Sequence, residues 1–347
     1  MDLKDLRRNI GESCISCNKC VDQCLFLQRY GLPKDIADND NFDKTLAFEC
    51  SLCGLCEAIC PESLKVPLLH HSFRKEALSN DQNILKKYKR LLTYESFGAS
   101  NLLRLYKFPK GCDTALFPGC EFPHTRPHLT EKLFVHLKNK YNNIGLILDC
   151  CFKPSYDLGR ESFAMDKMNK LEATLVANGI KNIITVCSSC YIHLSEHLKG
   201  INVKFIYDYM EPLSNETAIY NKMHLIDPCS VRFEQGIHDK VRDILKGSGV
   251  GVKEHKYEGA TTLCCGEGGA TGFVTDIYKE AWVNKMDNDI TKEVITYCAG
   301  CTNVKRKVRS LHLMDILLEN KKSNLKHNIF GYLKRFFMKL RLSRLVD

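Results

Sequence analysis

The sequence lacks the long apolar run that a membrane-spanning helix requires. No stretch approaches the roughly 18 to 20 apolar residues needed to cross a bilayer. Residues 1–13 are polar, whereas a secretory signal sequence carries an apolar segment. We therefore expect a cytoplasmic protein, with membrane contact restricted to the peripheral kind at the inner face.

Motifs for binding nucleic acids or dinucleotides are also missing. The glycine-rich stretches 247–251 and 266–272 have neither the spacing nor the position between strand and helix of a phosphate-binding loop. The net charge of +9 fits several kinds of anionic partner, and much of the basic excess lies after residue 320. We expect no nucleic-acid partner, and no flavin or nicotinamide site in this chain.

Cysteine, by contrast, is abundant, with 19 residues in a chain of 347. In a secreted protein such a content indicates disulfides, but in a cytoplasmic protein the thiols stay reduced and more often bind metals. The spacing of the cysteines therefore carries most of the information in this sequence.

Eight cysteines near the N-terminus form two copies of one motif. Each copy has the spacing Cys-x2-Cys-x2-Cys-x3-Cys, 25 residues separate the copies, and Pro61 follows the second. This run is typical of proteins with two cubane 4Fe–4S clusters, in which the fourth cysteine of each copy binds the other cluster. The predicted ligand sets are Cys14, Cys17, Cys20 and Cys60 for one cluster, and Cys50, Cys53, Cys56 and Cys24 for the other. Zinc also uses paired cysteines, but it needs only four and does not explain eight interleaved ones.

The segments around these motifs predict helices. Apolar residues between the two motifs recur at helical spacing, which favours a mainly helical ferredoxin module over residues 1–67, with a βαβ ferredoxin as the alternative. Residues 68–111 carry leucines at similar intervals and predict a helical connector that ends near Pro109 and Gly111.

Beyond residue 111 the cysteines repeat with a period of about 110 residues. Each copy has one cysteine, then an adjacent pair, then a Cys-x2-Cys. The first copy comprises Cys120, Cys150, Cys151, Cys187 and Cys190, and the second comprises Cys229, Cys264, Cys265, Cys298 and Cys301. Gene duplication of a metal-binding unit accounts for two such sets, and we place the copies in domains 112–222 and 223–320.

Short apolar runs lead into these cysteines, and helical patterns alternate with them. The runs are TALFPGC, NIGLILDCC, NIITVCSSC, MHLIDPC, TTLCC and EVITYCAGC. Alternating strands and helices predict an α/β fold with two Rossmann-like domains, each containing a largely parallel sheet. Because ligands bind beyond the carboxyl ends of such strands, we expect the five thiols of each copy to gather at that edge.

These ten residues resemble the two CCG motifs of the heterodisulfide reductase catalytic subunit and its relatives. A two-cluster ferredoxin module followed by two CCG domains is similar to the membrane-linked form of that subunit. It is also similar to iron–sulfur subunits of anaerobic glycerol-3-phosphate dehydrogenase and of glycolate or lactate oxidases. The resemblance covers nearly the whole chain and implies that each complete motif binds a noncubane 4Fe–4S cluster through its five cysteines.

The two copies differ in one position. Gly266 follows the cysteine pair of the second copy, whereas Phe152 stands there in the first, and a phenylalanine resists backbone torsions that glycine allows. All five thiols are present in both copies, so we expect one or two noncubane clusters, with zinc or no metal as the alternatives for the first site. Cys112 is the leftover thiol, and we expect it to be a small buried residue.

Two functions follow from the resemblance. In the first, electrons pass through the cubane clusters to noncubane clusters that reduce a small disulfide, with the second-copy cysteines as the catalytic set. In the second, the chain is an anaerobic electron-transfer subunit that takes electrons from a flavoprotein dehydrogenase acting on glycerol 3-phosphate or a 2-hydroxy acid and passes them to quinone. Either one requires a redox partner, such as a flavoprotein, a membrane cytochrome or a quinone protein.

Two further features are secondary candidates. Four polar residues lie within three positions of an expected ligand and could bind an acidic substrate or deliver a proton, namely Lys153, His193, Arg232 and Glu267. The C-terminal segment 321–347 predicts a basic amphipathic helix with Ile329, Phe330, Leu333, Phe336, Phe337 and Leu340 on one face. That face fits an anionic membrane surface, or docking on the ferredoxin module or on a partner subunit.

Overall fold

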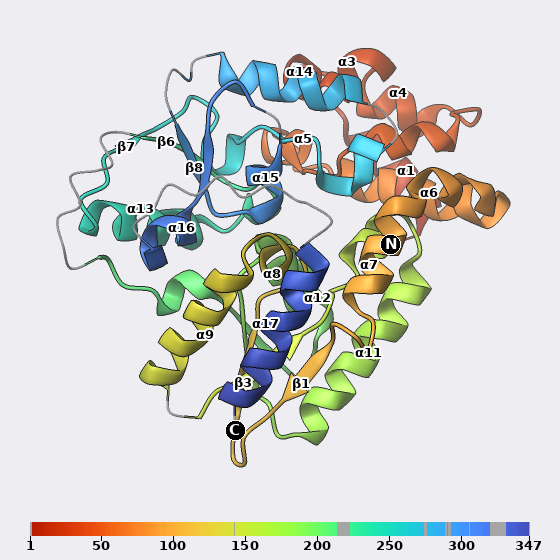
Figure 1. The fold of residues 1–347 in the computed structure, drawn as a ribbon. Coiled ribbons are helices and arrows are strands. Elements are labelled where there is room, and N and C mark those ends of the chain that lie inside the picture. The colour runs from red at the N-terminus through yellow and green to blue at the C-terminus, as the bar shows by residue number, and fades with distance from the viewer. Residues whose placement is uncertain are drawn as a thin grey trace.

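In the computed structural model of the protein, the chain folds into a helical N-terminal module and two α/β domains (Figure 1). The structure describes residues 2–141, 143–213, 223–273, 276–288, 290, 293–304, 306–319 and 331–346. Across these ranges no helix has the length and apolar character needed to cross a membrane. The predicted α/β fold class, with a mainly helical ferredoxin module, is confirmed.

Short helices separated by cysteine loops form the N-terminal module. They are α1 (Leu3–Ser13), α2 (Lys19–Gln23), α3 (Leu25–Tyr30), α4 (Pro33–Asp38), the 3-10 helix η1 (Lys44–Glu49) and α5 (Leu55–Ala58). Left-handed backbone occurs at matching positions of the two cysteine motifs, at Ser16 and Asn18 in the first and at Leu52 and Gly54 in the second. The motif is therefore repeated in backbone conformation as well as in sequence.

The connector leads from this module into the first sheet. It contains α6 (Val66–Asn80), the 3-10 helix η2 (Gln82–Tyr88), α7 (Lys89–Gly98) and the strand β1 (Leu105–Lys107). The strand β1 pairs antiparallel with β3 (Gly145–Leu148). Part of the segment expected to be a helical connector is therefore an edge strand of the first α/β domain.

The two α/β domains share one strand order. The first sheet runs β1-β3-β2-β4-β5 and the second runs β7-β6-β8-β9. The remaining strands are β2 (Thr114–Phe117), β4 (Asn182–Thr185), β5 (Asn202–Phe205), β6 (Met223–Ile226), β7 (Val252–Lys253), β8 (Val294–Thr296) and β9 (Ser310–His312). Apart from β1, all pairs are parallel, and β3-β2-β4-β5 corresponds to β7-β6-β8-β9. The cysteine repeat is thus a repeat of topology.

Helices cover both sheets and supply the loops that carry the cysteines. In the first domain they are α8 (Glu121–Thr125), α9 (Pro127–Lys140), α10 (Lys153–Asp157), α11 (Glu161–Ala177), α12 (Ser188–His197) and the 3-10 helix η3 (Ile206–Tyr209). In the second they are the 3-10 helices η4 (Cys229–Val231), η5 (Gly259–Thr261) and η6 (Gly268–Phe273), with α13 (Gln235–Gly247), α14 (Asp276–Asp287), α15 (Ala299–Asn303) and α16 (Leu313–Glu319). The prediction that TTLCC forms a strand is wrong, because Thr261 ends η5 and residues 262–265 are irregular backbone.

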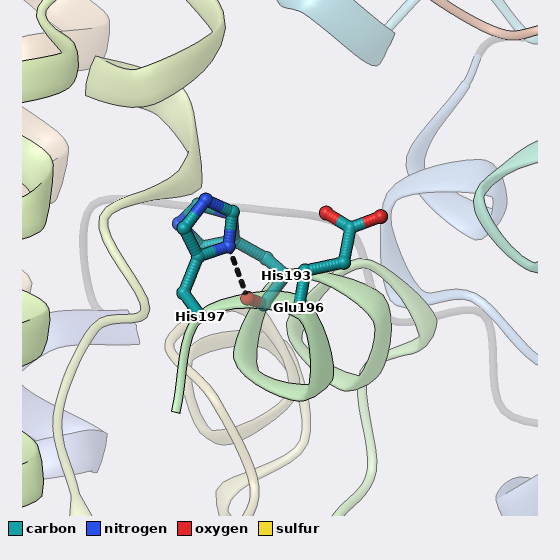
Figure 2. Close-up of side chains that lie close together, drawn as sticks. All are labelled: His193, Glu196 and His197. Carbon is teal, nitrogen blue, oxygen red and sulfur yellow. Dashed lines mark hydrogen bonds between the residues drawn. The ribbon is translucent and has the colours of Figure 1, made fainter. Parts of the chain in front are cut away.

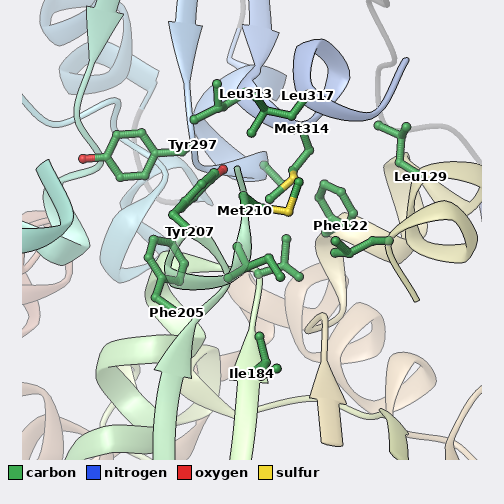
Figure 3. Packing of buried hydrophobic residues seen from close by; sticks show 14 of the residues in the cluster. Phe122, Leu129, Ile184, Phe205, Tyr207, Met210, Tyr297, Leu313, Met314 and Leu317 are labelled. Atoms are coloured by element: carbon green, nitrogen blue, oxygen red, sulfur yellow. The ribbon is translucent and has the colours of Figure 1, made fainter. Parts of the chain in front are cut away.

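One hydrophobic core joins the two α/β domains. Side chains from the first domain, including Phe122 and Phe205, belong to the same buried cluster as Tyr297 and Met314 of the second (Figure 3). Burial of apolar surface of this kind contributes roughly 25 cal/mol per Å². The relative position of the two domains is therefore fixed by a continuous core rather than by a linker.

Buried arginines connect all three parts of the chain. Arg74 on α6 donates to backbone carbonyls of η1 and of Cys50 in the second cysteine motif. It also donates to the carbonyls of Asp157 in the first domain (2.7 Å) and of Gly269 in the second (2.7 Å). Arg126 forms a buried two-point ion pair with Asp315, at 2.8 and 3.1 Å. Since a buried guanidinium is tolerated only where its donors are satisfied, these contacts fix where the three parts meet.

A buried carboxylate holds the second domain together at the end of β6. Asp227 accepts hydrogen bonds from Tyr297 (2.7 Å), Arg242 (2.9 Å) and the Gly259 amide (2.7 Å). Burial by itself would raise the pKa of Asp227, but the bonds from His238, Arg242 and Tyr297 outweigh it and hold this pKa below the ordinary 3.8. The group therefore stabilises the fold above pH 3.8, and this contribution is lost as the pH falls through the lower pKa of the folded protein.

We expect D227N to lower the free energy of unfolding of the second domain by roughly 2 to 3 kcal/mol, because Arg242 and Tyr297 lose a charged acceptor, while Arg242 keeps Glu254. Thermal unfolding at neutral pH measures the loss. The difference between wild type and variant should shrink as the pH is lowered past 3.8. An equal difference at all pH values would contradict the charge argument.

The C-terminal helix α17 (Gly331–Leu345) docks on the first α/β domain, beside α8, α9 and β1 (Figure 1). Its buried residues include Arg335, Met338 and Leu342. Leu333 and Phe337, expected on an apolar docking face, are 57% and 54% exposed. The expected docking on the ferredoxin module is therefore wrong, and the expected residues Ile329 and Phe330 lie outside the described part of the chain.

Candidate metal centres

Two cavities in the N-terminal module are lined by cysteines. One is lined by Cys14, Cys17, Cys20 and Cys60 together with Cys56, and the other by Cys24, Cys50, Cys53 and Cys56. These are the two interleaved sets that the motif predicts, including the exchanged fourth cysteines. Four convergent sulfurs around each cavity fit iron–sulfur clusters, and the identity of each ligand remains a prediction.

The two cavities adjoin. Cys56 lines both, and its thiol interacts electrostatically with Cys20 of the first set as well as with Cys24 of its own. The first cavity lies nearer the surface, because Cys17 is exposed and Ile15 beside it is 60% exposed. The thiols of the second set are more deeply buried.

In each α/β domain the five predicted thiols come together beyond the carboxyl ends of the parallel strands. The Sγ atoms of Cys151 and Cys190 are 3.3 Å apart in the first domain, and those of Cys265 and Cys301 are 3.5 Å apart in the second. Cys150 contacts both Cys120 and Cys151, and Cys264 contacts both Cys229 and Cys265. The two sets have the same internal arrangement.

The exposure of the thiols is repeated as well. Cys120 and Cys187 are partly exposed in the first set, as are Cys229 and Cys298 in the second, while the other three thiols of each set are buried. Each set therefore has one side open toward solvent and one side embedded in its domain.

Phe152 adopts the left-handed backbone that was expected to require glycine. Its φ is 56° and that of Gly266 is 81°, and their amides donate to Cys150 Sγ (3.3 Å) and Cys264 Sγ (3.2 Å), respectively. The Phe152 ring is buried against Cys120, Cys150 and neighbouring side chains. The substitution thus keeps the turn and fills one wall of the first site.

In the second copy the space beside the turn is occupied. A methyl group on Gly266 would lie 2.7 Å from the Lys279 Cα, and the left-handed φ adds strain. We expect G266A to destabilise the second domain by about 2 kcal/mol or more and to release iron. The matched control is G179A, where φ is 74° and no atom lies within 4 Å, which should cost only about 1 to 2 kcal/mol. Equal losses of stability and iron in both variants would contradict this account.

The thiol sets touch one another across the module and domain boundaries. The side chain of Cys53, in the second cavity of the ferredoxin module, is in hydrogen-bond contact with Cys264 of the second domain. Arg232 donates to the Cys53 carbonyl (2.9 Å) and to Thr262 (2.7 Å), which fixes this junction. The second domain, rather than the first, is therefore the one that meets the ferredoxin module at a thiol.

The two domain sets in turn face each other. Ser188, next to Cys187, contacts the thiol of Cys298 and bonds to Ser230, next to Cys229, at 2.8 Å. On the other side Asn303 donates to Glu121, which follows Cys120, at 2.5 Å. The exposed Cys17 thus lines the first ferredoxin cavity, Cys56 joins that cavity to the second, and contacts continue from there through the second set to the first.

The pKa values of these thiols reflect burial and mutual contact. Burial raises the pKa of Cys20 to about 11 and that of Cys50 to about 12, while a hydrogen bond with Cys301 lowers the pKa of Cys298 to about 7. Because metals bind thiolates, loading of the buried sets releases protons and becomes more favourable as the pH rises.

The polar candidates differ in how much of their bonding capacity is already used. Arg232 donates to three carbonyls and Lys153 pairs with Asp157 at 2.7 Å. Glu267 pairs with Lys279. His193 is buried, its Nε2 has no hydrogen-bond partner among the described residues, and burial lowers its pKa to about 4, so its ring is neutral at pH 7. Of the four, His193 is therefore the one with a free nitrogen near a thiol set.

A second group of metal-binding type lies on α12, which the sequence analysis did not identify. His193, Glu196 and His197 lie one turn apart on this helix (Figure 2), and their potential ligand atoms are within 4.8 Å of one another. The His197 Nδ1 is bonded to the His193 carbonyl at 2.9 Å, which leaves Nε2 for other contacts. The spacing of one helical turn was a signal that a search for paired histidines could have found.

Known proteins share these features. A model of the 4Fe-4S dicluster domain matches residues 13–65, and a model of the cysteine-rich domain named CCG matches residues 114–195 and 223–304. The curated protein EtfAB:quinone oxidoreductase of Syntrophomonas wolfei is 25% identical over 213 residues, which is 54% of this chain. The chain spans only 30% of that relative's length.

A solved structure of a hypothetical protein from Helicobacter pylori has a similar fold. Its TM-score is 0.53 at 10% identity, over 94% of this chain and 75% of that one. The chain is therefore an iron–sulfur electron-transfer protein that combines a 4Fe-4S dicluster domain with two CCG cysteine-rich domains, as in heterodisulfide reductase-like iron–sulfur proteins.

Proposed function

We propose that this chain is an oxidoreductase that carries electrons from its surface to a small disulfide bound between the two α/β domains. The observation that carries this proposal is the series of adjoining cavities and contacts that leads from Cys17 to the facing sets of the two domains. Two cubane 4Fe–4S clusters in the ferredoxin module and a noncubane cluster at each domain set would supply transfer of single electrons. This order is supported by the contact of Cys53 with Cys264 and by the lack of a thiol contact between the ferredoxin cavities and the first set among the described residues.

The facing sets suit a substrate with two sulfurs. Reduction of a disulfide consumes two electrons and two protons and gives two thiols, so two adjacent sulfur-binding positions are needed. Cys298 and Cys187 are both partly exposed, and Ser188 lies between them. In this proposal the open sides of the sets receive one sulfur each, and the buried thiols keep each set in place.

Electrons would enter at the first ferredoxin cavity. Exposed Cys17 and Ile15 lie at its edge, and an apolar residue beside an exposed ligand fits a transient redox partner. A flavoprotein or a membrane cytochrome or quinone protein is the expected class of partner.

A second candidate is an electron-carrying subunit that delivers electrons to quinone. The named activity of the Syntrophomonas relative favours it, and so does the outer face of α17, where Leu333 and Phe337 are exposed among basic residues. In that case the disulfide position is not used and the substrate meets another chain.

Reoxidation kinetics distinguish the two. Anaerobic protein reduced by a low-potential dye is mixed either with a panel of small disulfides or with a soluble quinone, and cluster absorbance is followed. The first proposal predicts rapid reoxidation by one of the disulfides and stoichiometric release of two thiols. Reoxidation by quinone alone would support the second candidate and overturn the first.

A further inference from the structure

Four arginines are among the largest fully buried side chains of the protein, and one of them differs from the others. Two of the others, Arg74 and Arg232, donate to backbone carbonyls, and Arg126 donates to a carboxylate and a hydroxyl. Arg335 is 0% exposed, but only its Nη2 has a partner, the Gly98 carbonyl at 2.9 Å. Its Nε and Nη1 have no hydrogen-bond partner among the described residues.

The unpartnered side of this guanidinium lies beside the first thiol set. A methyl group placed on Gly98 would be 3.2 Å from Arg335 Nη1 and 3.8 Å from the Cys120 Cβ. The guanidinium and the Cys120 side chain therefore both lie next to Gly98. The positive charge also acts on Asp149, the residue before Cys150. Arg335 thus approaches the set from α17, which contributes no cysteine to it.

The carboxylates nearby are already bonded. Asp149 accepts from Tyr106 and from the Cys150 amide at 2.8 Å, and Glu121 accepts from Tyr94 at 2.6 Å and from Asn303. A buried charge with two free donors is costly unless an anion completes its surroundings. Because the side chain is fully buried, that anion must lie inside the protein. Asp149 supplies one negative charge near Arg335, and the thiol set is the other anionic group beside it.

We propose that Arg335 is the counter-charge of a negatively charged iron–sulfur cluster at the first thiol set. This inference rests on the part of the proposed function that places a cluster there. A fixed positive charge favours the more negative, reduced state, so Arg335 raises the reduction potential of the first set. In the second domain, Arg232, three residues after Cys229, has no such free donor, because it donates to three carbonyls. The first set is thereby favoured as the end of the electron path.

The test is a redox titration of the anaerobic full-length protein, followed by electron paramagnetic resonance, with iron analysis. C151S identifies the signal of the first set. In R335M we expect the reduced fraction of that signal at a fixed potential to fall by about tenfold or more, with R335K closer to wild type. The matched control is R341Q on the same helix, where Arg341 is an exposed partner of Glu131 and should leave the signal unchanged.

Several outcomes would overturn the proposal. An unchanged titration in R335M, or the same change in R341Q, would show that the charge of Arg335 is not responsible. If R335M loses iron from all sets, R335Q replaces it as the uncharged variant, and a wild-type titration of R335Q would again be contrary. A wild-type protein without any signal removed by C151S would also overturn it. If the Arg335 effect is present but no disulfide is reduced, the result would count against disulfide reduction only, and not against the role of Arg335.

Discussion

Replacing Cys264 with serine should stop electrons from leaving the ferredoxin module. Cys264 is fully buried, contacts Cys229 and Cys265 of its own set and touches Cys53 of the ferredoxin module. C264S therefore removes a thiolate at the junction between the two. We expect the loss of about four irons and a fall in the rate of electron delivery to the α/β domains on the order of 100-fold or more.

The measurement is stopped-flow reduction of the anaerobic variant, with iron content determined on the same sample. The matched control is C112S, because Cys112 is also buried but belongs to no set and bonds to the Thr114 carbonyl at 2.9 Å. C112S should keep its iron and its rate. Wild-type kinetics in C264S would contradict the proposed electron path.

Replacing Arg74 with methionine should separate the ferredoxin module from the α/β domains. Arg74 donates to carbonyls in all three parts of the chain, and methionine leaves these buried acceptors unsatisfied. We expect the free energy of unfolding to fall by roughly 3 to 5 kcal/mol. Because this arginine also bonds to the Cys50 carbonyl, the second ferredoxin cavity should lose order as well.

Thermal unfolding and limited proteolysis between residues 98 and 114 test this prediction. The matched control is R160M, since among the described residues the Arg160 side chain makes one hydrogen bond, to the Ser155 hydroxyl, and lies over the Phe163 ring. R160M should cost about 1 kcal/mol. Similar losses in the two variants would show that Arg74 does not join the three parts.

The features that the sequence predicted well are those in which spacing alone constrains the geometry. Two Cys-x2-Cys-x2-Cys-x3-Cys runs can wrap two adjacent cavities with exchange of the fourth ligand, and the structure brings together those sets. Strands such as β2 and β4 were visible because a short apolar run ends at a cysteine at the edge of a parallel sheet.

The contacts between distant segments could not be predicted in this way. Nothing in the local sequence indicates that Arg74 bonds to Gly269, or that Cys53 meets Cys264, because these pairs depend on how the domains pack. For α17 the helical periodicity was right, but periodicity does not reveal that Arg335 is buried while Leu333 is exposed. The TTLCC run was apolar for another reason, since Cys264 and Leu263 are core residues in irregular backbone.

The central claim is that all four thiol sets hold iron and that two of them meet a thiol substrate. The most direct measurement is the iron, sulfide and zinc content of anaerobically purified protein, with electron paramagnetic resonance after oxidation in the presence of candidate thiols. About sixteen irons and a new paramagnetic signal that depends on the thiol are the predicted result. About eight irons without such a signal would mean that only the ferredoxin module is loaded, and would contradict the claim.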